Sequence, residues 1–161
     1  MPHSRNTLLK ARFEVVRRDL TEVMGRITPE ILDWAPAPGM RTTSGQILEI
    51  LATEIQLIAS LKDEPWITDE AAAQTLGDYR DLEVLKQALT DVRQQTLNYL
   101  DSFSEADLAE EIEYGAGWFG SLNLPTFPRA EVFLNIADHE WYHVGQLTSY
   151  LWSRGDDPYT W

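Results

Sequence analysis

The sequence predicts an all-α protein, and within that class a four-helix bundle. Four segments place apolar residues at alternating steps of three and four, the spacing of one buried helix face. Prolines and glycines interrupt the chain between these segments. Each segment is long enough for a helix of roughly 18 to 25 residues, and such helices bury their apolar faces against one another. The 161 residues are enough for one domain, 1–161, with a continuous core.

The first two helices are separated by a proline-rich break. The first follows Leu9, Phe13, Val16, Leu20, Val23 and Ile27. Pro29 and the run Ala35-Pro36-Ala37-Pro38-Gly39 end it. The second starts at Ser44, continues through Ile47, Leu51, Ile55, Ile58 and Leu61, and stops before Pro65.

The third and fourth helices are joined by the longest connection in the chain. The third follows Leu82, Leu85, Leu89, Val92, Thr96, Tyr99 and Phe103, and we expect Asp78 to cap it. The fourth begins after Pro128 and ends near Gly155. The connection 104–128 predicts a long loop or a short hairpin over one end of the bundle. Within it Trp118 and Phe119 lie between glycines, so they could form a lid.

The charge is strongly acidic. Lysine and arginine number 13 against 26 aspartates and glutamates, a formal net charge of −13. Such a surface repels phosphate backbones, so we expect no nucleic-acid partner. It favours a divalent cation. The chain has no cysteine, which excludes thiolate ligands and a cysteine nucleophile.

The chain also lacks the patterns of export and membrane insertion. The segment Met1-Pro2-His3-Ser4-Arg5 has no apolar run of a signal peptide. No stretch approaches the roughly 20 apolar residues of a membrane span. We therefore expect a cytoplasmic protein without a membrane partner.

Two of the three histidines lie in the fourth helix, in Asp138-His139-Glu140-Trp141-Tyr142-His143-Val144-Gly145-Gln146. On a helix His139 and His143 are offset by about 40° and lie one turn apart, so both imidazoles can bind one divalent metal. Gln146 returns to the same face. The alternative is a pair of buried, hydrogen-bonded histidines, but two adjacent imidazoles are costly to bury without partners.

The same segment matches the His-Glu-x-x-His signature of zinc metalloproteases, in which Glu140 would be the general base. That interpretation needs a third ligand further along the chain. The only acidic residues after His143 are Asp156 and Asp157, and they lie beyond the expected end of the helix. Such proteases also carry a sheet beside this helix, and the sequence shows little strand pattern. We therefore disfavour the protease interpretation.

The chain resembles the DinB/YfiT-like superfamily of metal-dependent four-helix proteins. The resemblance is specific in the segment 138–147 and in Tyr150-Leu151-Trp152-Ser153-Arg154-Gly155, with weaker support from Leu32-Asp33-Trp34 and Thr43-Ser44-Gly45-Gln46. It implies a divalent metal, zinc or nickel, held by three histidines. Two of these correspond to His139 and His143. The third, on the second helix, falls at Ile50, which cannot bind a metal.

A carboxylate on the second helix is the expected replacement. Glu54 lies one turn beyond Ile50 on nearly the same face, so we expect a ligand set of His139, His143 and Glu54. Alternatively, Glu54 hydrogen-bonds a histidine without binding metal. Glu49 is turned about 100° from Ile50 and ranks lower. Gln146 and Glu140 are expected to support the ligands through hydrogen bonds.

The resemblance implies two alternative functions. The first is a metal-dependent thiol S-transferase or hydrolase that acts on adducts of low-molecular-weight thiols. The second is a non-catalytic, stress-associated bundle whose metal site has degraded through the loss of the third histidine. Either form would be a homodimer. The residue that faces His139 and His143 from the second helix separates the two.

Overall fold

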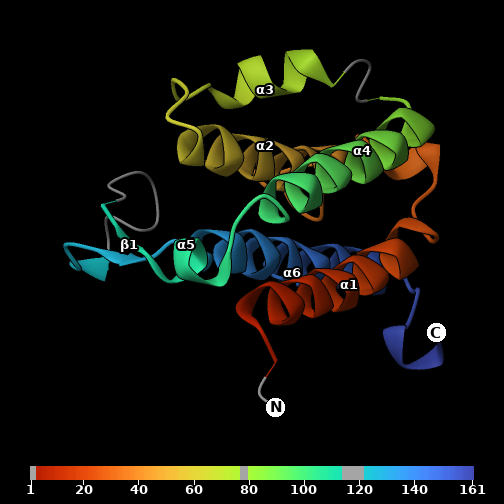
Figure 1. The fold of residues 1–161 in the computed structure, drawn as a ribbon. Helices are drawn as coiled ribbons and strands as arrows, with labels where there is room; N and C mark the ends of the chain where they lie inside the picture. The colour runs from red at the N-terminus through yellow and green to blue at the C-terminus, as the bar shows by residue number, and fades with distance from the viewer. Residues whose placement is uncertain (1–2, 77–79, 114–121) are drawn as a thin grey trace.

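Four long helices form a bundle in the computed structural model, which describes residues 3–76, 80–113 and 122–161 (Figure 1). They are α1 (Arg5–Met24), α2 (Thr43–Leu61), α4 (Leu82–Leu100) and α6 (Ala130–Ser153). The predicted all-α class and the four predicted helices are confirmed. None of the helices in the described ranges is both long enough and apolar enough to cross a lipid bilayer.

The other elements of the described residues are short and lie between the long helices or, for the last one, after α6. They are the 3-10 helices η1 (Pro29–Ile31) and η3 (Pro158–Thr160), the helices α3 (Asp69–Thr75) and α5 (Glu105–Ala109), and the strands β1 (Glu111–Ile112) and β2 (Phe127–Pro128). The two strands pair antiparallel, with Ile112 opposite Phe127. The connection before α6 therefore contains the expected short hairpin. Trp118 and Phe119, the expected lid, lie outside the described residues.

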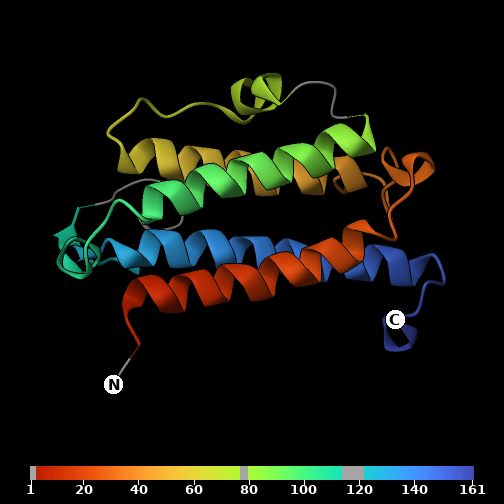
Figure 2. The same cartoon turned by 45° about the vertical axis from the view of Figure 1, so that its right-hand side comes forward.

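The long helices form two pairs that run in opposite directions. Helices α1 and α6 run one way, and α2 and α4 run the other way (Figure 2). Because α2 and α4 are parallel, the chain must cross the length of the bundle between them. The segment that carries α3 makes this crossing along the outside of α2 (Figure 1).

Side-chain caps fix where the helices begin. Ser4, Thr42, Thr68 and Ser104 each accept a hydrogen bond from a backbone N–H in the first turn of the helix that follows. Helix α4 is capped by Asp81, whose Oδ1 accepts from the N–H of Glu83 at 2.9 Å. The prediction of Asp78 as this cap is therefore wrong by one turn, and Asp78 itself lies outside the described residues.

The buried core is divided into two apolar halves. One half contains Leu20, Val23, Met24, Ile47, Ile50, Leu51, Leu82, Leu85, Leu89, Val92, Val144, Leu147 and Leu151. The other contains Leu9, Phe13, Val16, Leu57, Ile58, Leu100, Val132, Phe133, Ile136 and Ala137. Along each long helix the change from one half to the other falls at one charged residue. These residues are Arg17 in α1, Glu54 in α2, Arg93 in α4 and Glu140 in α6.

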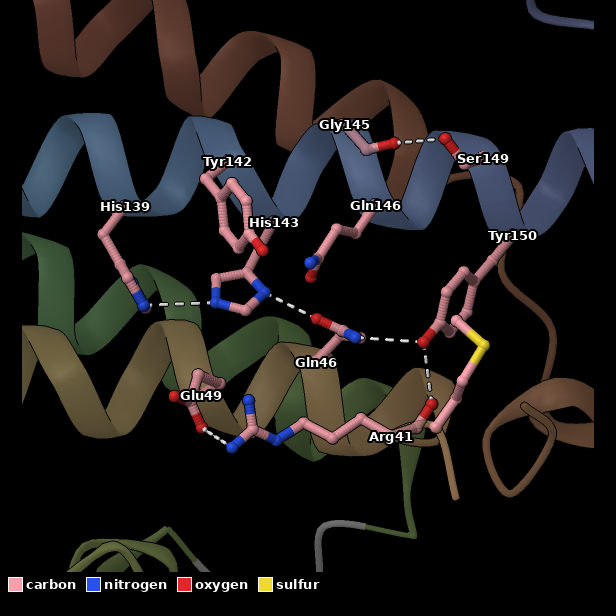
Figure 3. A pocket seen from close by; sticks show the side chains of 11 residues that line it. Arg41, Gln46, Glu49, His139, Tyr142, His143, Gly145, Gln146, Ser149 and Tyr150 are labelled. Carbon is pink, nitrogen blue, oxygen red and sulfur yellow. Dashed lines mark hydrogen bonds and ion pairs between the residues drawn. The ribbon is translucent and has the colours of Figure 1, made fainter. Parts of the chain in front are cut away.

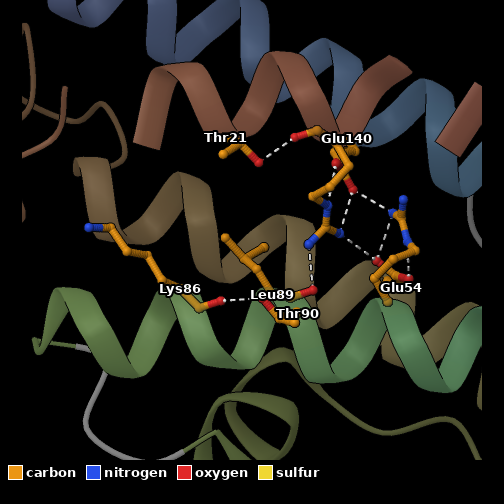
Figure 4. A network of polar contacts seen from close by, with 8 residues as sticks. Thr21, Glu54, Lys86, Leu89, Thr90 and Glu140 are labelled. Carbon is orange, nitrogen blue, oxygen red and sulfur yellow. Dashed lines mark hydrogen bonds and ion pairs between the residues drawn. The ribbon is translucent and has the colours of Figure 1, made fainter. Parts of the chain in front are cut away.

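These four residues form a charge-balanced layer across the bundle, which we call the ionic layer (Figure 4). Arg93 donates to both Glu54 oxygens at 2.8 and 3.0 Å and to Glu140 Oε2 at 2.5 Å. Arg17 forms a bidentate pair with Glu140, 3.0 Å in both bonds, and also donates to the backbone carbonyl of Leu89. Glu54 and Glu140 are each only 1 % exposed. Buried charges are tolerable when they are paired in this way, and removing one partner is costly.

We predict that Glu140→Gln lowers the free energy of unfolding by about 3 kcal/mol, because it leaves the buried guanidinium of Arg93 and the half-buried guanidinium of Arg17 with one carboxylate. The measurement is urea denaturation followed by circular dichroism. Asp138→Asn on the same helix is the matched control, since Asp138 pairs with Arg12 on the surface at 3.2 Å. The control should cost less than about 1 kcal/mol. Equal losses in the two variants would contradict a stabilising role for the ionic layer.

Candidate metal centre

His139 and His143 meet at one edge of α6, on the side that faces α2 (Figure 3). Their Nε2 atoms lie 3.1 Å apart. His143 is 2 % exposed, whereas His139 is half-buried at the mouth of a pocket. Two imidazoles bound to one zinc at about 2.0–2.1 Å with tetrahedral angles hold their nitrogens about 3.3 Å apart. The observed separation therefore suits one shared divalent metal.

A chain of hydrogen bonds fixes which nitrogen His143 presents. Its Nδ1 lies 2.5 Å from Gln46 Oε1, and Gln46 Nε2 donates to the Tyr150 hydroxyl at 3.0 Å. That hydroxyl donates to the backbone carbonyl of Arg41 at 2.9 Å. A carbonyl can only accept, so the direction of every bond in the chain follows from it. His143 therefore carries its proton on Nδ1, and the lone pair of Nε2 faces His139.

Glu49 on α2 supplies a third donor. One ligand atom from each of Glu49, His139 and His143 lies within 4.8 Å of the other two. The Glu49 carboxylate also pairs with Arg41, whose Nη2 lies 2.8 Å from Oε2 (Figure 3). Two imidazoles and one carboxylate form a donor set that binds zinc in catalytic sites.

Burial keeps both imidazoles neutral. It lowers the pKa of His139 to about 4, and the positive charge of Arg41 acts in the same direction. Burial also lowers the pKa of His143 to about 4, with further contributions from His139 and Arg41. Neutral imidazoles are the form that binds metals, so both are ready to do so at neutral pH. Burial raises the pKa of Glu49, while Arg41 opposes this effect.

The three donors open into a pocket of about 620 Å³ between α2 and α6. Its wall includes Met40, Tyr142, Gln146 and Ser149. The Gln146 Oε1 atom is buried and has no hydrogen-bond partner within the described residues. A pocket of this size can hold a small molecule, and most of the residues that line it carry polar side chains.

The structure does not bring Glu54 to the histidines. Its carboxylate is held by Arg93 in the ionic layer, and the group of donors that does form contains Glu49 instead. The reason is the rotation of α2 about its own axis, which decides which side chains point toward α6. Ile50 is 2 % exposed and packs in the apolar core, and Glu54 faces the core as well. The edge of α2 that faces the histidines carries Gln46, Glu49 and Thr53, and the Thr53 hydroxyl lies 3.5 Å from His139 Nε2.

Glu140 and Gln146, the two expected supporting residues, occupy different surroundings. Gln146 lines the pocket beside His143 (Figure 3). Glu140 points away from the pocket into the ionic layer, where both of its oxygens are bound by arginines. It stabilises the helix that carries the histidines rather than the histidines themselves. A carboxylate held in this way also cannot serve as the general base that the protease interpretation requires.

Sequence reasoning missed the roles of Gln46, Tyr150 and Arg41. Gln46 and Tyr150 appear in the segments that carry the family resemblance, but nothing in their spacing indicates a hydrogen bond between them. They are 104 positions apart and meet only because α2 and α6 pack together. Gln46 shares its edge of α2 with the polar residues Glu49 and Thr53, so no break in an apolar stripe marks it in the sequence.

A family model described as the DinB superfamily matches residues 12–147, most of the chain. The chain belongs to the DinB superfamily. This confirms the resemblance seen in the sequence. A comparison with curated proteins found no match.

Several solved structures share the DinB fold with this chain. The colibactin self-resistance protein ClbS, in complex with double-stranded DNA, has a TM-score of 0.66 at 17 % identity and covers 94 % of this chain and 96 % of its own. The sibling lethal factor precursor DfsB has a TM-score of 0.69 at 18 % identity, with coverages of 93 % and 96 %. An uncharacterised protein from Escherichia coli UTI89 has a TM-score of 0.66 at 15 % identity, and each chain is covered to 96 %.

The expectation that a nucleic-acid partner is excluded is contradicted by the ClbS structure. A protein with this fold is observed on double-stranded DNA. The expectation was drawn from the net charge of −13, which is a sum over the whole chain. Such a sum does not describe the local potential on any one face, so it cannot exclude a partner class.

We predict that the stability of the metal-free protein falls as the pH falls from about 6.5 to about 4. Over this range the unfolded histidines bind protons while the folded ones, with pKa values of about 4, do not. Each histidine adds a slope of up to about 1.4 kcal/mol per pH unit. The measurement is urea denaturation at several pH values on wild type and on a His139→Gln, His143→Gln double variant. Parallel pH profiles for the two proteins would contradict the prediction.

Proposed function

We propose that this protein is a metal-dependent enzyme whose divalent metal, zinc or nickel, is held by His139, His143 and Glu49. The observation that carries the proposal is the convergence of these three donors, with the two histidine Nε2 atoms 3.1 Å apart, on a pocket of about 620 Å³. A purely structural metal site is closed by four protein ligands, whereas three ligands facing a pocket leave a position open.

The proposed substrate class rests on the resemblance to the DinB/YfiT-like superfamily. We propose adducts of low-molecular-weight thiols as substrates, in a transfer or hydrolysis reaction. Because the chain contains no cysteine, any thiol in the reaction belongs to the substrate. A divalent metal bound here would supply Lewis acidity, which lowers the pKa of a water or thiol at the open position.

The chain's own residues prepare the site for this chemistry. Gln46 holds the His143 ring in one tautomer, so its Nε2 lone pair is available without rearrangement. Met40 and Tyr142 belong to the pocket wall, and the Tyr142 ring packs edge-on against the His143 ring with 5.2 Å between centroids. The half-buried surroundings strengthen electrostatic interactions with a charged reacting group, because less water screens them.

The alternative function is a non-catalytic bundle with a degraded metal site. It remains the competing proposal because Ile50 cannot bind metal. The position of Glu49 favours the enzyme, since this residue offers a carboxylate where α2 faces the histidines. Metal affinity separates the two proposals, because a degraded site would bind zinc weakly or not at all.

We predict that zinc binds with one-to-one stoichiometry and that His143→Ala abolishes binding. Glu49→Gln should weaken binding at least tenfold, because the neutral amide is a poor substitute for a carboxylate ligand. Glu54→Gln is the matched control. Glu54 lies on the same helix, but its carboxylate is bound by Arg93 and not by the metal. The zinc affinity of Glu54→Gln should therefore stay within about twofold of wild type. The measurement is isothermal titration calorimetry on metal-free protein, with circular dichroism to verify folding.

The opposite ranking, with Glu54→Gln damaging zinc binding and Glu49→Gln harmless, would refute the proposed ligand set. Absence of zinc and nickel binding in the folded wild type would favour the non-catalytic alternative. If the metal binds as proposed, the metal-loaded protein should turn over model thiol adducts. The His143→Ala variant should then lose this activity.

A further inference from the structure

The ion pair between Arg41 and Glu49 stands between two cavities. The pocket at the histidines, of about 620 Å³, and a second pocket of about 600 Å³ between α2 and α3 are both lined by these two residues. Arg41 directly precedes Thr42, the cap of α2, so its backbone is held while its side chain reaches along the helix to Glu49 (Figure 3). The pair therefore forms a partition made of two movable side chains.

The Glu49 carboxylate has two competing uses. It lies 2.8 Å from the Arg41 guanidinium, and it is also the carboxylate of the proposed metal site. The Arg41 side chain is 51 % exposed, so its pair with Glu49 is a surface ion pair of modest strength. A divalent cation at the histidines attracts the carboxylate and repels the guanidinium. Occupancy of the metal site therefore weakens the hold of Glu49 on Arg41.

We infer that Arg41 anchors a carboxylate group of the substrate, and that it becomes available for this when Glu49 engages the metal. This inference rests on the proposed function and deepens it, because it assigns the substrate class as thiol adducts that carry a carboxylate. Metal and carboxylate then bind cooperatively. By linkage, each increases the affinity of the other by the same factor.

Charge and geometry favour a single carboxylate at this position. Among the described residues lining the two pockets, Arg41 is the one with a full positive charge. A guanidinium binds a carboxylate through two parallel hydrogen bonds. The second pocket also contains Asp69 and Glu70, which repel a more highly charged anion. The first pocket, on the other side of Arg41, has Glu49 as its acid, and Met40 and the rings of Tyr142 and Tyr150 give it apolar surface for the tail of such a ligand.

The expected coupling is small and measurable. An exposed ion pair of this kind contributes at most about 1 kcal/mol, which limits the coupling to about fivefold in affinity. We predict that hexanoate, a monocarboxylate with an apolar tail, binds zinc-loaded wild type two to five times more tightly than the zinc-free protein. Hexanamide, its neutral counterpart, should show no such difference.

The experiment is calorimetry of hexanoate binding to zinc-loaded and zinc-free protein at constant ionic strength, in wild type, Arg41→Met and Arg41→Lys. In Arg41→Met the dependence on zinc should disappear. Zinc itself should bind this variant two to five times more tightly than wild type, because Glu49 has lost its competing partner. Arg41→Lys keeps the charge without the bidentate geometry and should retain part of the coupling.

Two results would overturn the inference. Equal hexanoate affinity with and without zinc in wild type would show that the two sites are not coupled. A zinc dependence that survives in Arg41→Met would show that the carboxylate binds the metal directly. Both results presuppose that zinc binds to wild type, so they overturn the inference without overturning the proposed function. The proposed function fails if wild type binds no metal or if Glu49→Gln leaves the zinc affinity unchanged.

Discussion

The ionic layer is the constraint on which the rest of the structure depends. Each long helix contributes one charge to it, three of them buried and that of Arg17 half-buried, and the two arginines balance the two glutamates. Apolar packing alone tolerates small rotations and shifts of helices, because one leucine can replace another in contact. A bidentate ion pair between buried groups does not tolerate such shifts. A shift of one residue would leave a buried charge without a partner. The layer therefore fixes the rotation and the register of all four helices at one level of the bundle.

This constraint places the metal centre. On α6, Glu140 turns into the ionic layer, which leaves its neighbour His139 at the edge of the helix, with His143 one turn further on. On α2, Glu54 turns into the same layer, which directs Gln46 and Glu49 toward the edge that faces the histidines. The carboxylates that pair with the arginines of the ionic layer thus differ from the donors that face the pocket, although the two sets lie within a few residues of each other on the same two helices.

Periodicity predicted the helices because apolar spacing records directly which face of a helix is buried. It also predicted the histidine pair, since two ligands one turn apart need no tertiary information. The expectation of Glu54 as the third donor requires Ile50 to face the histidines, whereas Glu49 does, and one residue turns a helix by about 100°. The sequence alone does not show which of these residues faces the histidines. Ile50 and Glu54 do share a face, but it is the face toward the core, and only the pairing of Glu54 with Arg93, 39 positions away, reveals this. The same holds for Gln46, whose partners are distant in the chain.

The central claim is that one divalent metal is held by His139, His143 and Glu49, while Glu54 belongs to the ionic layer. The most direct measurement is anomalous X-ray diffraction at the zinc edge from crystals of the zinc-loaded protein. We predict one strong anomalous peak within about 2.2 Å of both histidine Nε2 atoms and a Glu49 oxygen, with Glu54 still bound to Arg93. A peak coordinated by Glu54, or a zinc-saturated crystal without a peak between the two histidines, would contradict it.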